Sequence, residues 1–545
     1  VDGSHIKGLI LNMFATFWPS LLKIKGFFQT INTPILKAWK KTDSKKSSPK
    51  IFFTKSDFDK WSLTSEMSKW NIKYYKGLGT STEKEAKEIF QSFHEKILTF
   101  IEESNSIDSN SENEIKEKPL KIKLKKNESD NEISEHSFSD DLSIELKEST
   151  SDHILLAFDK NKADNRKVWL YDYDKDDILE FGNKMSITYP DFINKDLKHF
   201  SNYDNIRSIP NIMDGFKPSQ RKIMYACFKR GYNSGEIKVA QLAGYVAQHT
   251  EYHHNEDSLK GTIIGLAQNY VGSNNLNFLT PSGNFGYRNL LGKDHASPRY
   301  IFTQLEKLTG KIFREEDENI LNYIDEDGTL IEPDYYTPII PTILINGCSG
   351  IGTGFSTSIT SFNPIDIINN IKSLLNDKKI NEMYPWYKGF TGNIKKTDEN
   401  KYISIGLYEI IDSNTVNIKE IPIGTSITDY KNYLDSHIQI NKDDKNKIID
   451  KVINNSGNNK VDFTIKFKGS ELKKLFKDGE EKLVKFLKLT SPISLTNLHL
   501  YNSECKMSKY DNVNDIIEEF FKDRLKIYKK RIDFMINKLK NLLDL

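Results

Sequence analysis

The sequence contains few cysteines and no paired cysteine motif, which excludes two classes of protein. Its three cysteines lie far apart in 545 residues, and no two of them form a Cys-x-x-Cys pair. They are Cys227, Cys348 and Cys505. This distribution excludes a zinc ribbon and a disulfide framework, and it is typical of a reducing compartment.

Long apolar runs are also missing from the sequence. The stretch at 6–22 is interrupted by Lys7, Asn12 and Pro19, and it lacks the flanks of a signal peptide. We therefore expect a soluble, intracellular protein with no membrane partner.

The sequence has no large net charge and no phosphate-binding loop. Its formal charge is +2 with 28% of residues charged, so only local clusters can indicate a nucleic-acid partner. The glycine-dense stretch at 346–354 has no P-loop lysine, and its glycine spacing is not a dinucleotide fingerprint. The length predicts several domains rather than one core.

Changes in composition along the chain predict where ordered segments begin and end. Residues 1–101 mix apolar segments with turns, as in an α/β domain. Residues 102–152 are dominated by Ser, Asn, Glu and Lys, and we predict a disordered insertion because they offer too little apolar surface to offset ordering entropy. Order resumes near His153, and residues 341–500 alternate short β-like runs with polar turns.

Two helices are predicted in the middle of the chain. The first begins with Pro218 after Lys217, a favoured helix start, and runs through QRKIMYACFKR. The second, VAQLAGYVAQH at 239–249, carries apolar residues at helical spacing. A short glycine-containing link joins the two helices, so the pattern fits a helix-turn-helix or winged-helix unit.

The segment at 207–230 is strongly basic, with a local net charge of +5. Its cations are Arg207, Lys217, Arg221, Lys222, Lys229 and Arg230, and its one acidic residue is Asp214. This density of positive charge suits binding to a phosphate backbone. An ordinary solvated basic helix is the alternative.

Arg299 and Tyr300 are adjacent within Ser297-Pro298-Arg299-Tyr300. A tyrosine hydroxyl can attack phosphorus if a neighbouring cation stabilises the charge that develops, and the planar guanidinium of Arg299 could supply that cation. The dipeptide alone carries no weight, and its meaning depends on the basic segment and histidines nearby.

Three other features could take part in chemistry or DNA binding, and each also has a less specific interpretation. His253 and His254 could bind a phosphate oxygen or move a proton, although a structural role is more common for such a pair. Ile351 between two glycines could be an exposed wedge between base pairs, or part of a buried turn. Asp2 offers a single carboxylate, and a magnesium site draws on several oxygens, so further ligands would precede residue 1.

The last predicted helix carries an apolar residue every three or four positions. The series is Phe521, Leu525, Tyr528, Ile532, Met535, Leu539 and Leu542. This spacing is typical of a heptad seam between helices, and an amphipathic helix packed on its own domain is the alternative.

Together these motifs resemble those of type IIA DNA topoisomerases of the eukaryotic kind, which some large DNA viruses also carry. The resemblance runs nearly end to end outside 102–152. The matching segments are DGSHIKGL at 2–9, YYKGLGTST at 74–82, DNRKVWL at 164–170, RSIPNIMDGFKPSQRK at 207–222, VAQLAGYVAQHTEYHH at 239–254, ASPRYIFT at 296–303 and NGCSGIGTG at 346–354.

The resemblance implies a multidomain α/β and α+β protein. Its implied domains are a partial Toprim domain at 1–101, the insertion at 102–152, a connecting segment at 153–200, a winged-helix (helix-turn-helix) domain with the active-site tyrosine at 201–340, a sheet-containing tower domain at 341–508 and the start of a C-terminal coiled coil at 509–545. It also implies a fragment that lacks the N-terminal ATPase domain and the first part of Toprim.

The resemblance assigns the catalytic roles to Tyr300, Arg299 and His254. Tyr300 would attack a DNA phosphorus, displace the 3′ oxygen and become joined to the 5′ phosphate, with His254, a water or Arg299 assisting the loss of its proton. Asp2 matches the third aspartate of the family's metal motif. The implied DNA contacts are Lys167, Arg207, Lys217, Arg221, Tyr252, His253, Ser258 and the bending wedge Ile351.

The implied activity is that of an ATP-dependent DNA topoisomerase, an isomerase that cleaves both strands, passes a second duplex through the break and reseals it. Mg²⁺ and ATP are the implied cofactors, with ATP bound by a domain outside this chain. Double-stranded DNA and a second copy in a homodimer are the implied partners, in the nucleus or at a site of viral DNA replication. The fragment alone is expected to be inactive.

Two departures from the family pattern and two alternative functions accompany the resemblance. Asn255 replaces a glycine common after the histidine pair, and Cys348-Ser349 replaces the usual Ala-Glu. A non-catalytic DNA-binding scaffold is one alternative, which the intact Arg299-Tyr300 disfavours. A tyrosine-based nuclease or recombinase is the other, which the Toprim-like motifs disfavour.

Overall fold

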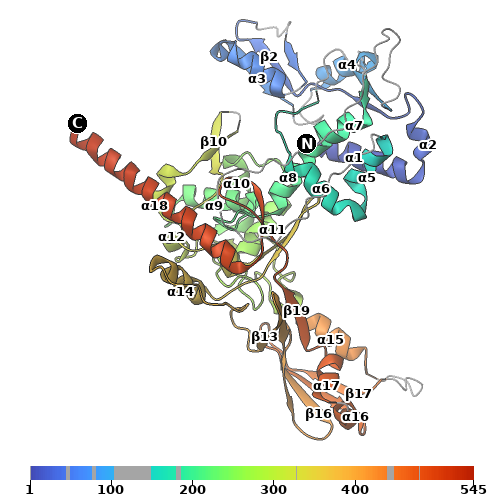
Figure 1. Ribbon diagram of the computed structural model, residues 1–545, viewed down its shortest axis with the longest axis vertical. Helices are drawn as coiled ribbons and strands as arrows, with labels where there is room; N and C mark the ends of the chain where they lie inside the picture. The colour runs from blue at the N-terminus through green and yellow to red at the C-terminus, as the bar shows by residue number, and fades with distance from the viewer. Residues whose placement is uncertain are drawn as a thin grey trace. The chain divides into compact units, whose positions relative to one another are not determined.

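The computed structural model describes residues 2–43, 49–53, 55–75, 82–91, 93–102, 149–179, 186–326, 328–438, 447–477 and 479–544. The chain divides into two compact units, here called unit 1 and unit 2 (Figure 1). Unit 1 comprises Val1–Asn205 with Thr353–Phe355, and unit 2 comprises Ile206–Gly352 with Ser356–Leu545. The predicted disordered insertion and the KGLG motif at 76–79 lie outside the described residues, apart from the flanks of the insertion.

Unit 1 contains two small sheets with helices packed beside them. The larger core surrounds a sheet of order β1-β5-β6, formed by Gln29–Ile31, Ile97–Ile101 and Ser186–Thr188, in which β6 runs parallel to β5. The second sheet has the order β3-β2-β4, formed by Lys50–Phe52, Leu36–Lys40 and Trp70–Tyr74. The helices are α1 (Asp2–Phe17), α2 (Pro19–Leu22), α3 (Lys55–Leu63), α4 (Glu83–Gln91), α5 (Thr150–Phe158), α6 (Ala163–Tyr171), α7 (Tyr189–Phe192) and most of α8 (Lys198–Ser208).

Aromatic side chains fill the cores of unit 1. Phe28, Phe100 and Tyr189 are buried together against the first sheet, and Phe100 meets Phe28 edge to face with ring centroids 4.9 Å apart. Helix α5 begins at Thr150, three positions before the predicted return of order at His153, because Ser149 caps it by accepting from the Asp152 amide.

The two helices predicted in the middle of the chain are confirmed in unit 2. Helix α9 covers Pro218–Arg230 with Pro218 in its first turn, and α10 covers Val239–His249. The apolar residues that predicted α10 are buried, as the helical spacing requires, and they are Val239, Leu242, Ala243 and Val246. Helix α11 (Glu256–Ala267) completes this core, and the hairpin of β9 (Tyr323–Glu326) and β10 (Thr329–Pro333) lies beside α9.

The predicted sheet-rich region also belongs to unit 2. Strands β15 (Leu407–Ile410), β16 (Thr415–Glu420), β18 (Phe463–Phe467) and β17 (Ile449–Asn454) form a four-stranded antiparallel sheet in that order. A second sheet, β13-β14-β19, is formed by Asn393–Asp398, Lys401–Ile405 and Thr490–Ser494. Helices α15 (Ile427–Asp435), α16 (Glu471–Lys477) and α17 (Glu480–Phe486) lie beside the four-stranded sheet and bury one of its faces (Figure 1).

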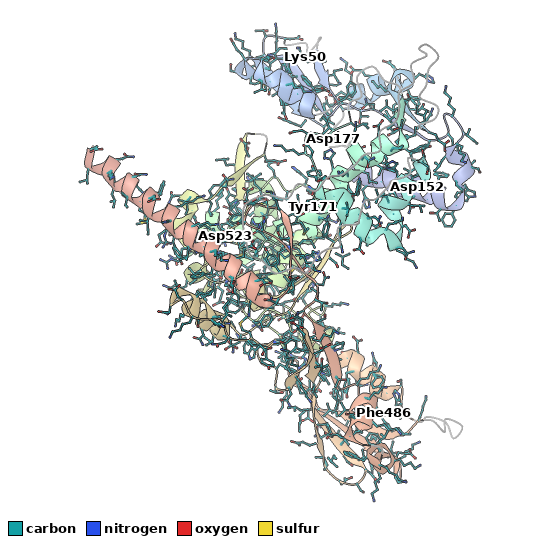
Figure 2. All side chains as sticks on the ribbon, in the orientation of Figure 1. Lys50, Asp152, Tyr171, Asp177, Phe486 and Asp523 are labelled. Atoms are coloured by element: carbon teal, nitrogen blue, oxygen red, sulfur yellow. The ribbon has the colours of Figure 1, made fainter. Side chains whose placement is uncertain are left out.

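Helix α18 (Val513–Asp544) has a packed half and an exposed half. Ile516, Ile517 and Phe520 are buried in the core of unit 2, and Asp523 lies on the same half (Figure 2). The C-terminal part of the helix extends away from the rest of unit 2 (Figure 1), and the predicted seam residues there are exposed. They are Ile532, Met535, Leu539 and Leu542. The packed half agrees with the amphipathic alternative, and pairing along the seam stays a prediction.

Arginines on α18 anchor this helix to a short helix that follows the Tyr300 segment. Asp317, buried in the 3-10 helix at Glu315–Ile320, accepts hydrogen bonds from Arg524 at 2.6 Å and Arg531 at 3.1 Å. Both guanidinium groups also contact the ring of Tyr528, with their central carbons 4.0 and 4.9 Å from its centroid. The orientation of α18 within unit 2 is therefore fixed at this point.

No helix among the described residues combines the length and apolar character needed to cross a bilayer.

Two glycines of unit 2 should respond in opposite ways to alanine. Gly244 lies on the exposed side of α10, and no atom lies near the position that a Cβ would take, so Gly244→Ala should raise the free energy of unfolding by about 0.5–1 kcal/mol. In Gly350→Ala the new Cβ would meet the Ser208 carbonyl oxygen at 2.0 Å, which should lower stability by about 1–3 kcal/mol. Urea denaturation of both variants measures this, and equal effects would contradict the packing around Gly350.

Candidate active site

Tyr300 lies on a tight turn that is tied to the start of α10. Its amide donates to the Ser297 carbonyl at 2.9 Å, and the carbonyls of Pro298 and Ile301 accept from the amides of Ala240 and Val239 at 3.1 and 3.0 Å. Ile301 is buried, whereas Tyr300 is 70% exposed. The backbone is thus held from both sides while the phenol faces solvent, where a ligand can reach its hydroxyl.

Cations flank this tyrosine. The guanidinium carbon of Arg299 lies 5.9 Å from the centre of the Tyr300 ring, a cation–π distance. Lys238 reaches the same segment from β7 (Ile237–Lys238), which pairs with β8 (Phe302–Thr303), and its ammonium lies 5.8 Å from the centre of the Phe302 ring. The guanidinium of Arg299 thus lies beside the Tyr300 ring, and its predicted role at phosphorus stays a prediction. Lys238 is a cation that the sequence motifs did not single out.

The histidine pair occupies the turn between α10 and α11. The ring of His254 packs edge to face against Tyr252 at 5.4 Å, and His253 lies 3.6 Å from the Glu326 carboxylate on the β9–β10 hairpin. Ser258 is exposed in the first turn of α11. These contacts hold the pair next to the hairpin, and the proton acceptor for Tyr300 stays open among the predicted candidates.

Asn255, the first departure from the family pattern, is accommodated without strain. Its φ of −59° is an ordinary angle that does not require glycine, and its side chain caps α11 by accepting from the Asp257 amide at 2.9 Å. The substitution therefore adds a helix cap rather than distorting the loop.

Ile351 stands exposed at the end of β11 (Cys348–Ile351), where the residue is 85% accessible. This excludes the alternative in which Ile351 belongs to a buried turn. Strand β11 pairs with β12 (Ser356–Ile359), and the Ser349 carbonyl accepts from the Lys217 ammonium at 2.8 Å. The second departure, Cys348-Ser349, thus lies on a regular strand, where burial raises the pKa of the Cys348 thiol.

Arg221 does not have the role predicted for it. It is only 6% exposed, and its guanidinium binds both carboxylate oxygens of buried Asp214, at 2.7 and 3.0 Å. A third bond goes to the Phe216 carbonyl. The prediction of a DNA-phosphate contact at Arg221 is wrong, because this bidentate pair neutralises the charge and encloses it in the core.

Pairing also reduces the free charge of the basic segment. The Lys222 ammonium lies 2.8 Å from the buried Glu332 carboxylate and donates to the Thr250 carbonyl at 2.7 Å. Lys217, Lys229 and Arg207 lie nearer the surface. The net charge counted from the sequence therefore overstates what this segment presents to a phosphate backbone.

The remaining predicted residues lie in unit 1. Lys167 on α6 is paired with Asp164 at 2.8 Å and is partly exposed. The DGSH motif begins α1, where Ser4 and Lys7 bind Asp196 at 2.5 and 2.7 Å. The side chain of Asp2 lies outside the described residues.

A magnesium site does not emerge from the side chains that the structure describes. Among them, no group of three or more His, Cys, Asp or Glu residues could hold a metal ion. Magnesium thus rests on the family resemblance alone, and no chemical step below depends on it.

Comparison with known proteins identifies the family. A family model for the A subunit of DNA gyrase/topoisomerase IV matches residues 207–545. The chain belongs to this family. A second model, the C-terminal associated domain of TOPRIM, matches residues 31–140 and 125–205. The resemblance to type IIA DNA topoisomerases is thereby confirmed.

Individual relatives of this topoisomerase-family chain match almost all of it. DNA topoisomerase 2 of Plasmodium falciparum is 41% identical over 99% of the chain and 34% of its own length. The mimivirus enzyme is 40% identical over 100% of the chain and 48% of its own length, and the Saccharomyces cerevisiae enzyme is 42% identical over 99% and 34%. The chain therefore spans between a third and a half of the length of these relatives.

A solved structure has the same fold. The chain is similar to a crystal structure of the Plasmodium falciparum topoisomerase II DNA-binding, cleavage and re-ligation domain, with a TM-score of 0.78 and 41% identity. The match covers 99% of this chain and 66% of that one. The mixed α/β architecture of this family member is therefore that of the cleavage region of its relatives.

Arg221 and Lys229 lie on the same helix but should behave differently on substitution. Arg221→Ala would leave the buried Asp214 carboxylate unpaired, and we expect a loss of about 3–5 kcal/mol in the free energy of unfolding. Lys229→Ala, an exposed control, should cost less than about 0.5 kcal/mol. Chemical denaturation measures both. A stable Arg221→Ala protein with weakened DNA binding would restore the phosphate-contact role.

Proposed function

We propose that this chain is the breakage-reunion core of a type II DNA topoisomerase and that Tyr300 is its nucleophile. The observation that carries the proposal is the exposed phenol of Tyr300 on a backbone tied to α10, with Arg299 beside the ring. This geometry offers a reactive oxygen and a cation to an incoming phosphodiester.

In the proposed cleavage step, the Tyr300 hydroxyl oxygen attacks a backbone phosphorus of DNA. The bond from phosphorus to the 3′ oxygen breaks, and the 5′ phosphate remains on the tyrosine. Free tyrosine has a pKa of about 10, so the proton must leave during the attack, and the released 3′ oxygen takes up a proton. Arg299 stabilises the negative charge that develops on the phosphoryl oxygens. The reverse steps reseal the strand.

The proposed DNA contacts are polar side chains of unit 2 that are exposed or partly exposed. Lys217 immediately precedes α9, Tyr252 and His253 lie between α10 and α11, and Ser258 lies in the first turn of α11; these side chains would bind the phosphate backbone. Ile351 would enter between base pairs and bend the duplex. Arg207 and Lys167 are further proposed phosphate contacts.

The activity of a whole enzyme is a wider proposal. In a protein as long as the relatives, we propose strand passage driven by ATP, a magnesium ion bound with the help of residues before Asp2, and a homodimer in which each subunit cuts one strand. The nucleus or a site of viral DNA replication would be its location.

Tyr300→Phe should abolish the covalent DNA adduct, because the attacking oxygen is removed, while the dissociation constant for DNA stays within about twofold. Tyr171, a residue that is 71% exposed compared with 70% for Tyr300, is a matched control on α6 (Figure 2). The assay traps labelled DNA in denaturing gels, using a protein that extends this chain to the length of its relatives. An adduct that persists in Tyr300→Phe, or is lost in Tyr171→Phe, would contradict the assignment. A DNA-binding scaffold would form no adduct in the unsubstituted protein, so an adduct that depends on Tyr300 distinguishes the two functions.

Ile351→Ala should reduce DNA bending, because alanine is too short to part stacked bases. Energy transfer between dyes at the two ends of a bound duplex should fall toward the value for straight DNA. Ile410→Ala, at an exposed isoleucine on β15, is the control and should leave energy transfer unchanged. Unchanged transfer in Ile351→Ala would remove the wedge from the mechanism.

A further inference from the structure

A buried ion pair joins the segment that carries Tyr300 to the four-stranded sheet. Arg288 lies on the 3-10 turn Arg288–Leu290, and Glu420 ends strand β16. Their side chains are 2% and 5% exposed, and the guanidinium and carboxylate meet at 2.6 Å. A charged pair enclosed to this degree binds two segments at one defined distance and angle.

The pair is completed by bonds to both backbones. The Arg288 guanidinium also donates to the Ile421 carbonyl at 2.8 Å, and the Ile421 amide donates to the Glu420 carboxylate at 2.9 Å. The other Glu420 oxygen accepts from the amide and hydroxyl of Thr391, at 3.2 and 2.9 Å. Both carboxylate oxygens are therefore used, which leaves the pair little freedom to shift.

Hydrogen bonds within residues 284–296 connect Arg288 to the segment that carries Tyr300. The Asp294 carboxylate accepts from the Tyr287 amide at 2.9 Å, directly next to Arg288. Asn284 donates to the Asp294 carbonyl at 2.9 Å, and the Asn284 carbonyl accepts from the Ala296 amide at 2.9 Å. Ala296 precedes the turn in which the Tyr300 amide bonds to Ser297.

Close backbone packing makes the same segment rigid. A Cβ at Gly286 would lie 2.4 Å from the Gly292 carbonyl oxygen, so the two sides of the loop are in direct contact. The Gln268 amide group on the end of α11 donates to the carbonyls of Phe285 and Gly292, at 2.9 and 3.1 Å. Displacement of Arg288 would therefore move the whole loop rather than one side chain.

We propose that Arg288 and Glu420 are positioning residues for cleavage, which hold the Tyr300 segment against the four-stranded sheet. The inference rests on the proposed function of Tyr300 as the nucleophile. Neither side chain touches the reacting atoms. Their effect is on geometry, and an error of about 1 Å in the placement of a nucleophile can slow a reaction by about 10²-fold.

Glu420→Gln is the decisive variant, since it keeps the shape of the side chain and removes its charge. We expect the rate of adduct formation to fall by about 10–100-fold with the DNA dissociation constant within about twofold. Arg288→Lys keeps the positive charge but loses the planar guanidinium group, and its rate of adduct formation should lie between those of the unsubstituted protein and Glu420→Gln. Both are measured in a protein extended to the length of the relatives.

Hydrogen exchange on the chain itself gives a second readout that needs no catalysis. In Glu420→Gln, amides at 284–296 should exchange about tenfold faster, while those of α10 keep their protection. Lys419→Met is the matched control: Lys419 is the neighbour of Glu420 on β16 and is paired with Asp462 at 3.7 Å, on a half-exposed side of the strand. It should change neither readout.

The outcomes separate this inference from the proposed function. An unchanged adduct rate in Glu420→Gln, or unchanged exchange at 284–296, overturns the positioning role while Tyr300 stays the nucleophile. Faster exchange throughout α10 also overturns it, because the pair would then only support the fold. If the unsubstituted protein forms no adduct at all, the proposed function fails, and the exchange experiment still decides whether the pair fixes the loop.

Discussion

One buried carboxylate, that of Asp214, organises the part of unit 2 on which the candidate site is built. Its oxygens accept from the Arg221 guanidinium and from the amides of Phe216 and Tyr336, and its backbone carbonyl accepts from the Thr342 hydroxyl at 2.6 Å. Helix α9, through Arg221, and the segments that carry Tyr336 and Thr342 therefore converge on a residue with no exposed surface. Because a buried charge is tolerated only when paired and bonded, none of these segments can move independently.

The site combines this rigid base with side chains that stay accessible. Tyr300 projects from a tight turn and Ile351 from the end of a paired strand, so that their backbones are fixed while their side chains are free to meet a ligand. Such an arrangement lets a large, flexible substrate adapt to the protein without requiring the protein to reorganise. The conformational entropy of these backbone segments is lost when the protein folds, so it does not weaken the binding of the ligand.

Features with local causes could be predicted from the sequence, and features that depend on distant partners could not. Helices α9 and α10 follow from a proline in the first turn and from apolar spacing, both of which act within a few residues. Arg221 was misassigned because a basic residue in a basic helix gives no sign that its charge is enclosed. The partner of Arg288 is still harder to foresee, since the Ile421 carbonyl that it binds lies 133 positions away.

The anchoring of α18 at Asp317 has a mechanical consequence. Beyond Arg531 the helix continues to Asp544, and at about 1.5 Å per residue this free part is a stiff arm of roughly 20 Å. A tilt of about 10° at the anchor would carry its far end sideways by roughly 3–4 Å, about the width of one side-chain contact. A small change in the orientation of Asp317, which follows the Tyr300 segment, would therefore produce a larger sideways displacement of the last residues of α18.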